Sequence, residues 1–97
     1  MVINIKVKNS NFSEHVIEET IKGSLDREFE NAKFKIDRYS KICDSFQKKY
    51  EMTSENFFNK FEKGMLTEDD DFFDWYAAKR GLEIWNEKYH VLLGISL

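Results

Sequence analysis

The apolar residues between Leu25 and Tyr50 recur at alternating intervals of four and three residues. They are Leu25, Phe29, Ala32, Ile36, Tyr39, Cys43, Phe46 and Tyr50. A helix with this spacing carries one apolar seam along its side for almost four heptads. Proline, which would interrupt such a helix, is absent from the chain. The rest of the fold must therefore be built against one long helix.

A second seam with the same spacing lies near the end of the sequence. Its residues are Trp75, Ala78, Leu82, Trp85, Tyr89 and Leu92. Thr67 and the acidic residues 68–71 precede this seam. They are typical of a helix start, because carboxylates favour the positive end of the helix macrodipole. We therefore expect a second long helix here.

The segment between the seams indicates a short connecting helix. A hydroxyl cap at 53–54 precedes three apolar side chains on one helical face, which are Phe57, Phe58 and Phe61. Gly64 marks the end of this helix. Two seams joined in this way predict an antiparallel hairpin, in which the small residues Ala32 and Cys43 make room opposite large ones such as the two Trp.

The first residues alternate between apolar and polar side chains. Ile3, Ile5 and Val7 fall on one side of an extended segment, which is the period of a half-buried strand. The sequence shows no second strand. We therefore expect this segment to pair with its own copy in another chain, to add to a partner's sheet edge, or to remain disordered.

A turn at residues 9–11 and a short helix from Ser13 to about Lys22 follow this segment. Gly23 and Ser24 then allow two interpretations. Ser24 could cap a new helix after a break, or Gly23 could be tolerated inside one continuous helix at a cost of about 1 kcal/mol.

Together these elements predict one mainly α domain over residues 1–97. A dimer is favoured, because a domain of this size can bury only a modest hydrophobic core by itself. A short N-terminal strand or arm occupies 1–10, and an antiparallel helical hairpin or bundle follows. The predicted helical segments are 13–50, with heptad spacing from 25, a short helix over 53–63, and a last helix over 68–93.

Composition narrows the classes of function. The net charge of −3 excludes a protein that coats nucleic acid by charge alone. No segment reaches the roughly 18 apolar residues of a membrane span, and the N-terminus does not resemble a secretory signal, so we expect a cytoplasmic protein without membrane contact.

Residue patterns that often carry chemistry favour structural roles here. The acidic run 68–71 with Asp74 lacks the spacing of a calcium loop, and Glu87 and His90 point away from the second seam. Cys43 lies on the first seam, where a buried thiol packs. We therefore expect no catalytic residue, no cofactor and no metal. A small metal-dependent enzyme remains a third hypothesis, behind the two developed below.

The order of the first elements is also that of ribbon–helix–helix DNA-binding proteins. In that hypothesis Asn4, Lys6 and Lys8 would reach DNA bases or phosphates from the polar side of a paired ribbon. The long heptad helix after Gly23 is unlike the short helices of that fold. A dimeric DNA-binding repressor is therefore the alternative function, together with a homo-oligomeric structural protein.

The middle of the chain carries a recognisable pattern. Residues 50–57 read Tyr-Glu-Met-Thr-Ser-Glu-Asn-Phe, and residues 61–75 read Phe-Glu-Lys-Gly-Met-Leu-Thr-Glu-Asp-Asp-Asp-Phe-Phe-Asp-Trp. This pattern resembles a group of small archaeal and bacterial helical proteins, several of which look like antitoxins of toxin–antitoxin pairs. Thr67-Glu68 stands where such members often have Gly-Asp or Gly-Glu. The resemblance implies a helical protein without catalysis that wraps or plugs a small cognate toxin.

A further apolar stripe supports a role in binding other proteins. Phe73, Ala77, Ile84 and Val91 share a side of the last helix that the hairpin leaves uncovered, and Phe34 lies opposite the first seam. We predict a protein-interaction module, specifically an antitoxin, whose partners are a second copy and a small toxin. The expected contact residues are Phe34, Phe73, Ile84 and Val91, with Ile3, Ile5 and Val7 if the strand is shared.

Overall fold

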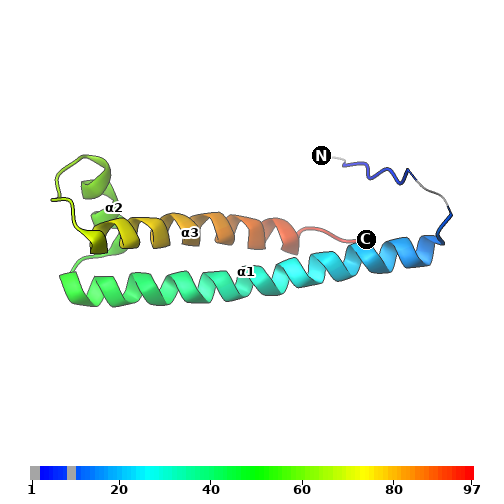
Figure 1. Ribbon diagram of the computed structural model, residues 1–97, viewed down its shortest axis with the longest axis horizontal. Helices are drawn as coiled ribbons and strands as arrows, with labels where there is room; N and C mark the ends of the chain where they lie inside the picture. The colour runs from blue at the N-terminus through cyan, green and yellow to red at the C-terminus, as the bar shows by residue number, and fades with distance from the viewer. Residues whose placement is uncertain (1–2, 9–10) are drawn as a thin grey trace.

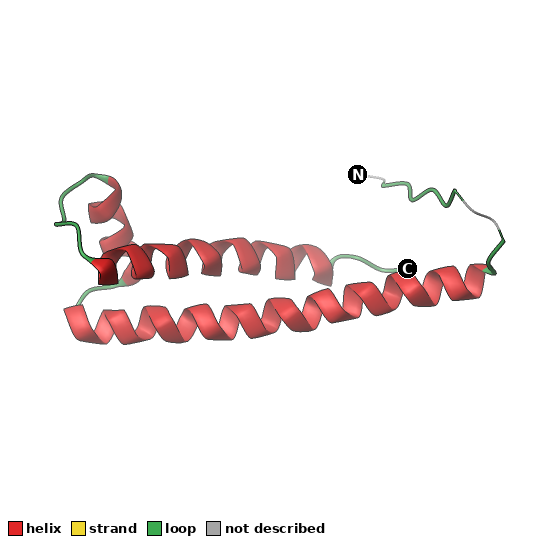
Figure 2. Cartoon of the chain, in the orientation of Figure 1, coloured by secondary structure: helices red, strands yellow, loops and turns green. Residues whose placement is uncertain are grey.

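The computed structural model describes residues 3–8 and 11–97, and within them it has three helices joined by short loops (Figure 1). They are α1 (Glu14–Tyr50), α2 (Ser54–Glu62) and α3 (Asp70–Leu93). α1 and α3 lie side by side and antiparallel, and α2 packs against both at one end of the hairpin (Figure 2). We call this end, residues 43–78, the tip. The predicted antiparallel hairpin is confirmed.

α1 is one continuous helix through Gly23, which decides between the two interpretations of that position. Ser13 caps it by accepting a hydrogen bond from the Val16 backbone N–H. The Ser24 hydroxyl does not cap a new helix, since it donates to the Thr20 carbonyl at 2.9 Å within the same helix. α1 ends at Tyr50, because the next residue, Glu51, adopts a left-handed backbone conformation with φ 51°.

The connecting helix and the last helix begin where side chains cap them. Thr53 accepts from the Asn56 backbone N–H, so α2 begins at Ser54, and Gly64 follows its end with φ +68°. α3 begins at residue 70 and not at the predicted 68. The reason is that Asp69 rather than Thr67 provides the cap, by accepting from the Asp71 backbone N–H at 2.9 Å.

The predicted N-terminal strand is wrong for the described residues. Residues 3–8 run without regular structure, and no strand occurs anywhere in the described ranges 3–8 and 11–97. The alternation of Ile3, Ile5 and Val7 fits a strand, but the chain offers this segment no second strand to pair with. The remainder of the predicted arm, residues 1–2 and 9–10, and most of the predicted turn at 9–11 lie outside the described residues.

The two predicted seams face each other, and they are buried most deeply at the tip. Trp75 and Phe57 are fully buried, with ring centroids 4.0 Å apart and ring planes 5° from parallel. Cys43 and Ala78 complete the buried cluster. Half-buried side chains surround it: Tyr39, Ile42, Phe46, Tyr50, Met52, Phe61, Leu66, Phe72, Tyr76 and Leu82. Cys43 thus lies in the same buried cluster as Trp75, in line with its predicted place on the first seam.

Polar groups inside the tip are paired. The Trp75 indole Nε1–H donates to the Ser54 hydroxyl at 2.9 Å, deep in the core. The Ser54 backbone N–H, at the start of α2, donates to Oε1 of Gln47 at 2.8 Å. Gln47 lies on α1, Ser54 on α2 and Trp75 on α3, so this chain of hydrogen bonds ties all three helices together.

Gly81 sets how closely α3 approaches α1 beyond the tip. A Cβ atom at this position would lie 2.8 Å from the Tyr39 ring, well inside contact distance. Only glycine lets the Tyr39 ring rest on the α3 backbone. A side chain on Gly81 would therefore force the Tyr39 ring or the helix to move.

The molecule is elongated. It measures 59 × 22 × 21 Å, with a radius of gyration of 19.1 Å. A compact domain of about 100 residues has a radius of gyration of about 13 Å. Figure 1 shows the reason, because α1 continues well past the end of α3. We call residues 3–8, 11–24 and 94–97, at the end away from the tip, the open end.

Candidate interaction surfaces

The outer face of α3 carries exposed apolar side chains. Phe73, Ile84 and Val91 are 51%, 44% and 59% exposed, and Ala77 is exposed between them. Ile84 follows the seam residue Leu82 by two positions, which is about 200° around a helix, so it lies outside the packed seam. It nevertheless lines a groove together with Glu28 of α1. We call these four residues the outer stripe.

α2 covers only one end of the outer stripe. The Phe61 ring meets Phe73 edge-on, with centroids 5.6 Å apart. No other ring contact within the described residues reaches the stripe. The short helix α2 therefore leaves Ile84 and Val91 open.

A groove of about 500 Å³ lies beside Ile84 and Val91. Its lining is Glu28, Ile84, Glu87, Lys88, Val91 and Leu92. The Lys88 ammonium sits over the Trp85 ring, 4.5 Å from its centroid, which holds the charge at the edge of the groove. Apolar side chains thus share this surface with charges of both signs, a composition typical of protein-binding sites.

Phe34 does not belong to this surface. Its side chain is 60% exposed, as expected, on α1. It follows the seam residue Ala32 by two positions and therefore points away from α3. Phe34 lines none of the grooves around the outer stripe, so the expected contact residues do not form one continuous surface.

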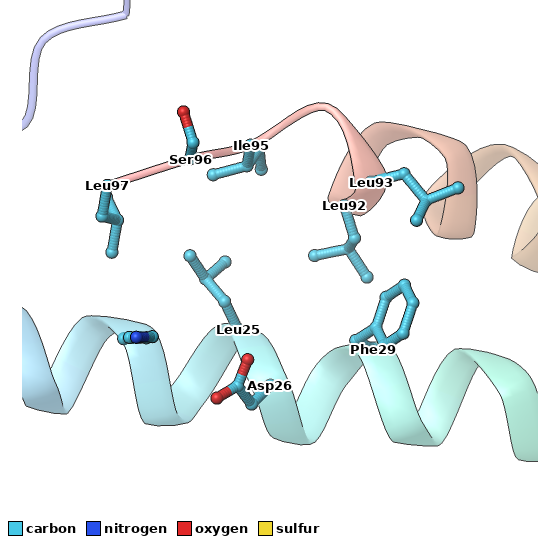
Figure 3. A pocket seen from close by; sticks show the side chains of 9 residues that line it. Leu25, Asp26, Phe29, Leu92, Leu93, Ile95, Ser96 and Leu97 are labelled. Atoms are coloured by element: carbon cyan, nitrogen blue, oxygen red, sulfur yellow. The ribbon is translucent and has the colours of Figure 1, made fainter.

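The open end is the second apolar surface. A groove of about 440 Å³ separates α1 from the end of α3 and the last residues of the chain (Figure 3). In Figure 3, Leu25 points from α1 toward the C-terminal segment, and Leu97 points back toward α1. Ile95 and Leu97 are nevertheless 45% and 65% exposed. The C-terminal segment therefore covers the start of the first seam only partly.

The N-terminal arm, residues 3–8, lies at the same end. Ile3, Ile5 and Val7 are 78%, 63% and 52% exposed. Further grooves join the arm to the start of α1, and their apolar lining is Ile5, Val7, Phe12, Val16, Ile17, Ile21 and Leu97. The predicted strand residues and the start of α1 thus form one apolar region. That α1 region had not been predicted as a site, although Val16, Ile17 and Ile21 are visible as an apolar run in the sequence.

The start of α3 is held to the end of α1 by charge. Asp71 Oδ2 accepts hydrogen bonds from Lys49 Nζ and from the Tyr50 hydroxyl, each at 2.6 Å. These bonds, Lys49 first, hold the pKa of Asp71 below its usual range. The bond to Asp71 raises the pKa of Lys49 and is also the main cause of the raised pKa of Tyr50. Asp71, predicted as part of a solvated acidic run, thus has a structural partner.

The other predicted chemical candidates lie apart from one another. Cys43 is buried, and burial raises the pKa of its thiol although the Ser54 hydrogen bond and Lys79 lower it. Glu87 and His90 are exposed, and His90 Nδ1 lies 2.7 Å from the Asn86 carbonyl oxygen. Across the described residues, no group of three or more His, Cys, Asp and Glu side chains is arranged to hold a metal ion.

The residues of the DNA-binding hypothesis are exposed on the arm. Asn4, Lys6 and Lys8 all lie in the described segment 3–8. The continuous α1 does not have the helix break at Gly23 that the ribbon–helix–helix order requires.

Comparisons with known proteins add no assignment. Neither the scan against protein-family models nor the searches of curated proteins and of solved structures found a match. No helix in the described part of the chain is long and apolar enough to span a membrane.

Proposed function

We propose that this chain is a non-enzymatic protein-interaction module, and specifically the antitoxin of a toxin–antitoxin pair. The observation that carries the proposal is the exposed outer stripe. Ile84 and Val91 are large apolar side chains on a helix whose opposite side is already packed against α1. Leaving them in water forgoes the free energy of their burial, about 1.5–3 kcal/mol for each side chain when complete.

The surface around the stripe has the features of a protein-binding site. Apolar anchors lie in and beside the groove, and Glu28, Glu87 and Lys88 stand at its edge. In protein complexes a few such anchors supply most of the affinity, while charges at the rim orient the partner. A partner helix or apolar ridge whose charges are complementary to those at the rim would fit here. The antitoxin part of the proposal rests on the sequence resemblance over residues 50–75.

Growth rescue tests this function. We expect the gene beside the one for this chain to encode a small protein that stops growth when expressed alone. Co-expression of the full chain is expected to restore growth, and the two proteins are expected to purify together. The double variant Ile84→Asp/Val91→Asp should lose rescue, because two carboxylates would be buried at the contact without partners.

Phe34→Asp is the matched control, because Phe34 is as exposed as Val91 but does not line the groove beside the outer stripe. It should keep full rescue. Circular dichroism of all variants checks that their helices are intact. A neighbouring product that is harmless alone, or full rescue by the double variant, contradicts the proposal.

A further inference from the structure

The chain exposes more surface than its size requires. Its accessible surface is 7808 Å². A compact monomer of 11.6 kDa exposes about 5,800 Å², which leaves an excess of about 2,000 Å². A standard protein–protein interface removes about 800 Å² from each partner. A second contact, separate from the outer stripe, can therefore be formed without opening the hairpin.

Much of the exposed apolar surface lies at the open end. The exposed large hydrophobic residues there are Ile3, Ile5, Val7, Phe12, Val16, Ile95 and Leu97. The backbone groups of residues 3–8 make no hydrogen bond to other described residues. An extended segment with free backbone groups and alternating apolar side chains is a template for pairing with another strand.

The arm is complementary to a second copy of itself in an antiparallel register centred on Ile5. In an antiparallel pair centred on Ile5, that residue faces its own copy, and Ile3 faces Val7 of the other chain. All the apolar side chains then lie on one face of the ribbon, as the two-residue period of a strand requires. On the other face Asn4 lies opposite Lys6, so no Lys faces a Lys.

Several other registers are disfavoured by charge or by pattern. A parallel pair in register places each Lys directly opposite its own copy, and an antiparallel pair centred on Val7 places Lys6 opposite Lys8. Like charges directly opposite each other destabilise a strand pair. An antiparallel pair centred on Lys6 brings Lys6 against its own copy. A slip of one residue, which places Ile5 opposite Lys6, mixes apolar with polar side chains on the same faces.

We propose that two copies of this chain associate through residues 3–8, which form a two-stranded antiparallel ribbon centred on Ile5 whose apolar face covers the start of α1. An isolated two-stranded ribbon is marginal in water. Here the grooves that join the arm to Phe12, Ile17 and Ile21 offer each strand an apolar support. The contact is symmetric and closed, so it ends at a dimer.

The mass in solution tests the association. Sedimentation of the full chain should give twice the mass of the 11.6 kDa monomer. Ile5→Asp should halve that mass, because it places two facing carboxylates on the apolar side of the ribbon. The matched control Ile84→Asp changes another exposed isoleucine on the outer stripe and should leave the dimer intact.

Cross-linking tests the register. Under oxidation Ile5→Cys should form a covalent dimer, because directly opposite residues lie within the Cα separation that a disulfide spans. Asn4→Cys and Lys6→Cys should each cross-link poorly alone and well when mixed, since residue 4 faces residue 6 of the other copy. The unsubstituted chain should stay uncross-linked, because Cys43 is buried.

Three outcomes overturn the proposal. They are a monomer at every concentration, a dimer whose mass Ile5→Asp does not change, and efficient cross-linking of Lys6→Cys alone. Because this contact and the outer stripe share no residue, any of these outcomes, observed while the unsubstituted chain still rescues growth, refutes the ribbon and leaves the proposed function standing.

Discussion

Replacing Gly81 by Ala should reverse the usual benefit of that change in a helix. In an exposed helix interior, alanine is more favourable than glycine by about 1 kcal/mol. At Gly81 the new Cβ would meet the Tyr39 ring at 2.8 Å. Carbon atoms pack best at about 3.5–4.0 Å, so the ring or the helix must move, and overpacking of this kind costs about 1–3 kcal/mol. We expect a net loss of up to about 2 kcal/mol from the free energy of unfolding.

Gly23→Ala is the matched control. Gly23 is also inside a helix, but its Cβ would lie 3.5 Å from Nη1 of Arg27, an ordinary contact with a movable side chain. This variant should gain about 1 kcal/mol. The difference between the two glycine variants, about 1–3 kcal/mol, isolates the contact with Tyr39.

Urea unfolding followed by circular dichroism measures both variants. All samples need the same protein concentration, because self-association adds to apparent stability. In a Tyr39→Ala background, Gly81→Ala should become stabilising, as Gly23→Ala is, because the ring is gone. The reasoning is refuted if Gly81→Ala stabilises the unsubstituted chain as much as Gly23→Ala does.

Two further changes test the tip. Ser54→Ala removes the acceptor of the buried Trp75 Nε1–H and should lower the free energy of unfolding in urea by about 1–3 kcal/mol. The control Ser45→Ala, on the exposed side of α1, should not lower it. Equal losses in the two variants would count against the Trp75–Ser54 hydrogen bond. Asp71→Asn should lower the thermal midpoint at neutral pH. Since the pKa of Asp71 is lowered in the folded state, its contribution is present above the ordinary value of 3.8 and is lost as pH falls through the folded pKa. The difference in thermal midpoint between Asp71→Asn and the unsubstituted chain should therefore disappear in acid. A difference that does not change with pH would exclude a stabilising role for the Asp71 carboxylate.

The seams were predictable because their spacing is a property of each helix alone. Every residue of both seams is buried or half-buried in the structure. The contacts between the helices were not predictable in the same way. Gly81 meets Tyr39, and Ser54 meets Trp75, only once the register of one helix against another is known. A single sequence does not contain that register.

The errors at the N-terminus and at the start of α3 have different physical causes. Alternation of Ile3, Ile5 and Val7 describes what a segment can pair with, but pairing also needs a second strand, which this chain does not supply. At α3, Thr67 and Asp69 are both good caps, and Asp69 is the one whose side chain reaches a helix N–H. Exposure of the outer stripe was predicted correctly, because it follows from the same helical period as the seams.

Because the aromatic rings are concentrated at the tip, the C-terminal end of α1 is well packed and its N-terminal end is not. The tip is built from residues 43–78, which are close in sequence, so little chain entropy is lost when it closes. The first turns of α1 have no such neighbours close in sequence. They can pack only against residues from the chain ends or from another molecule. We therefore expect the hairpin to form from the tip outward during folding, with the open end ordered last. We expect thermal opening to begin at the open end, so the residues of the proposed ribbon are those whose rearrangement costs least free energy.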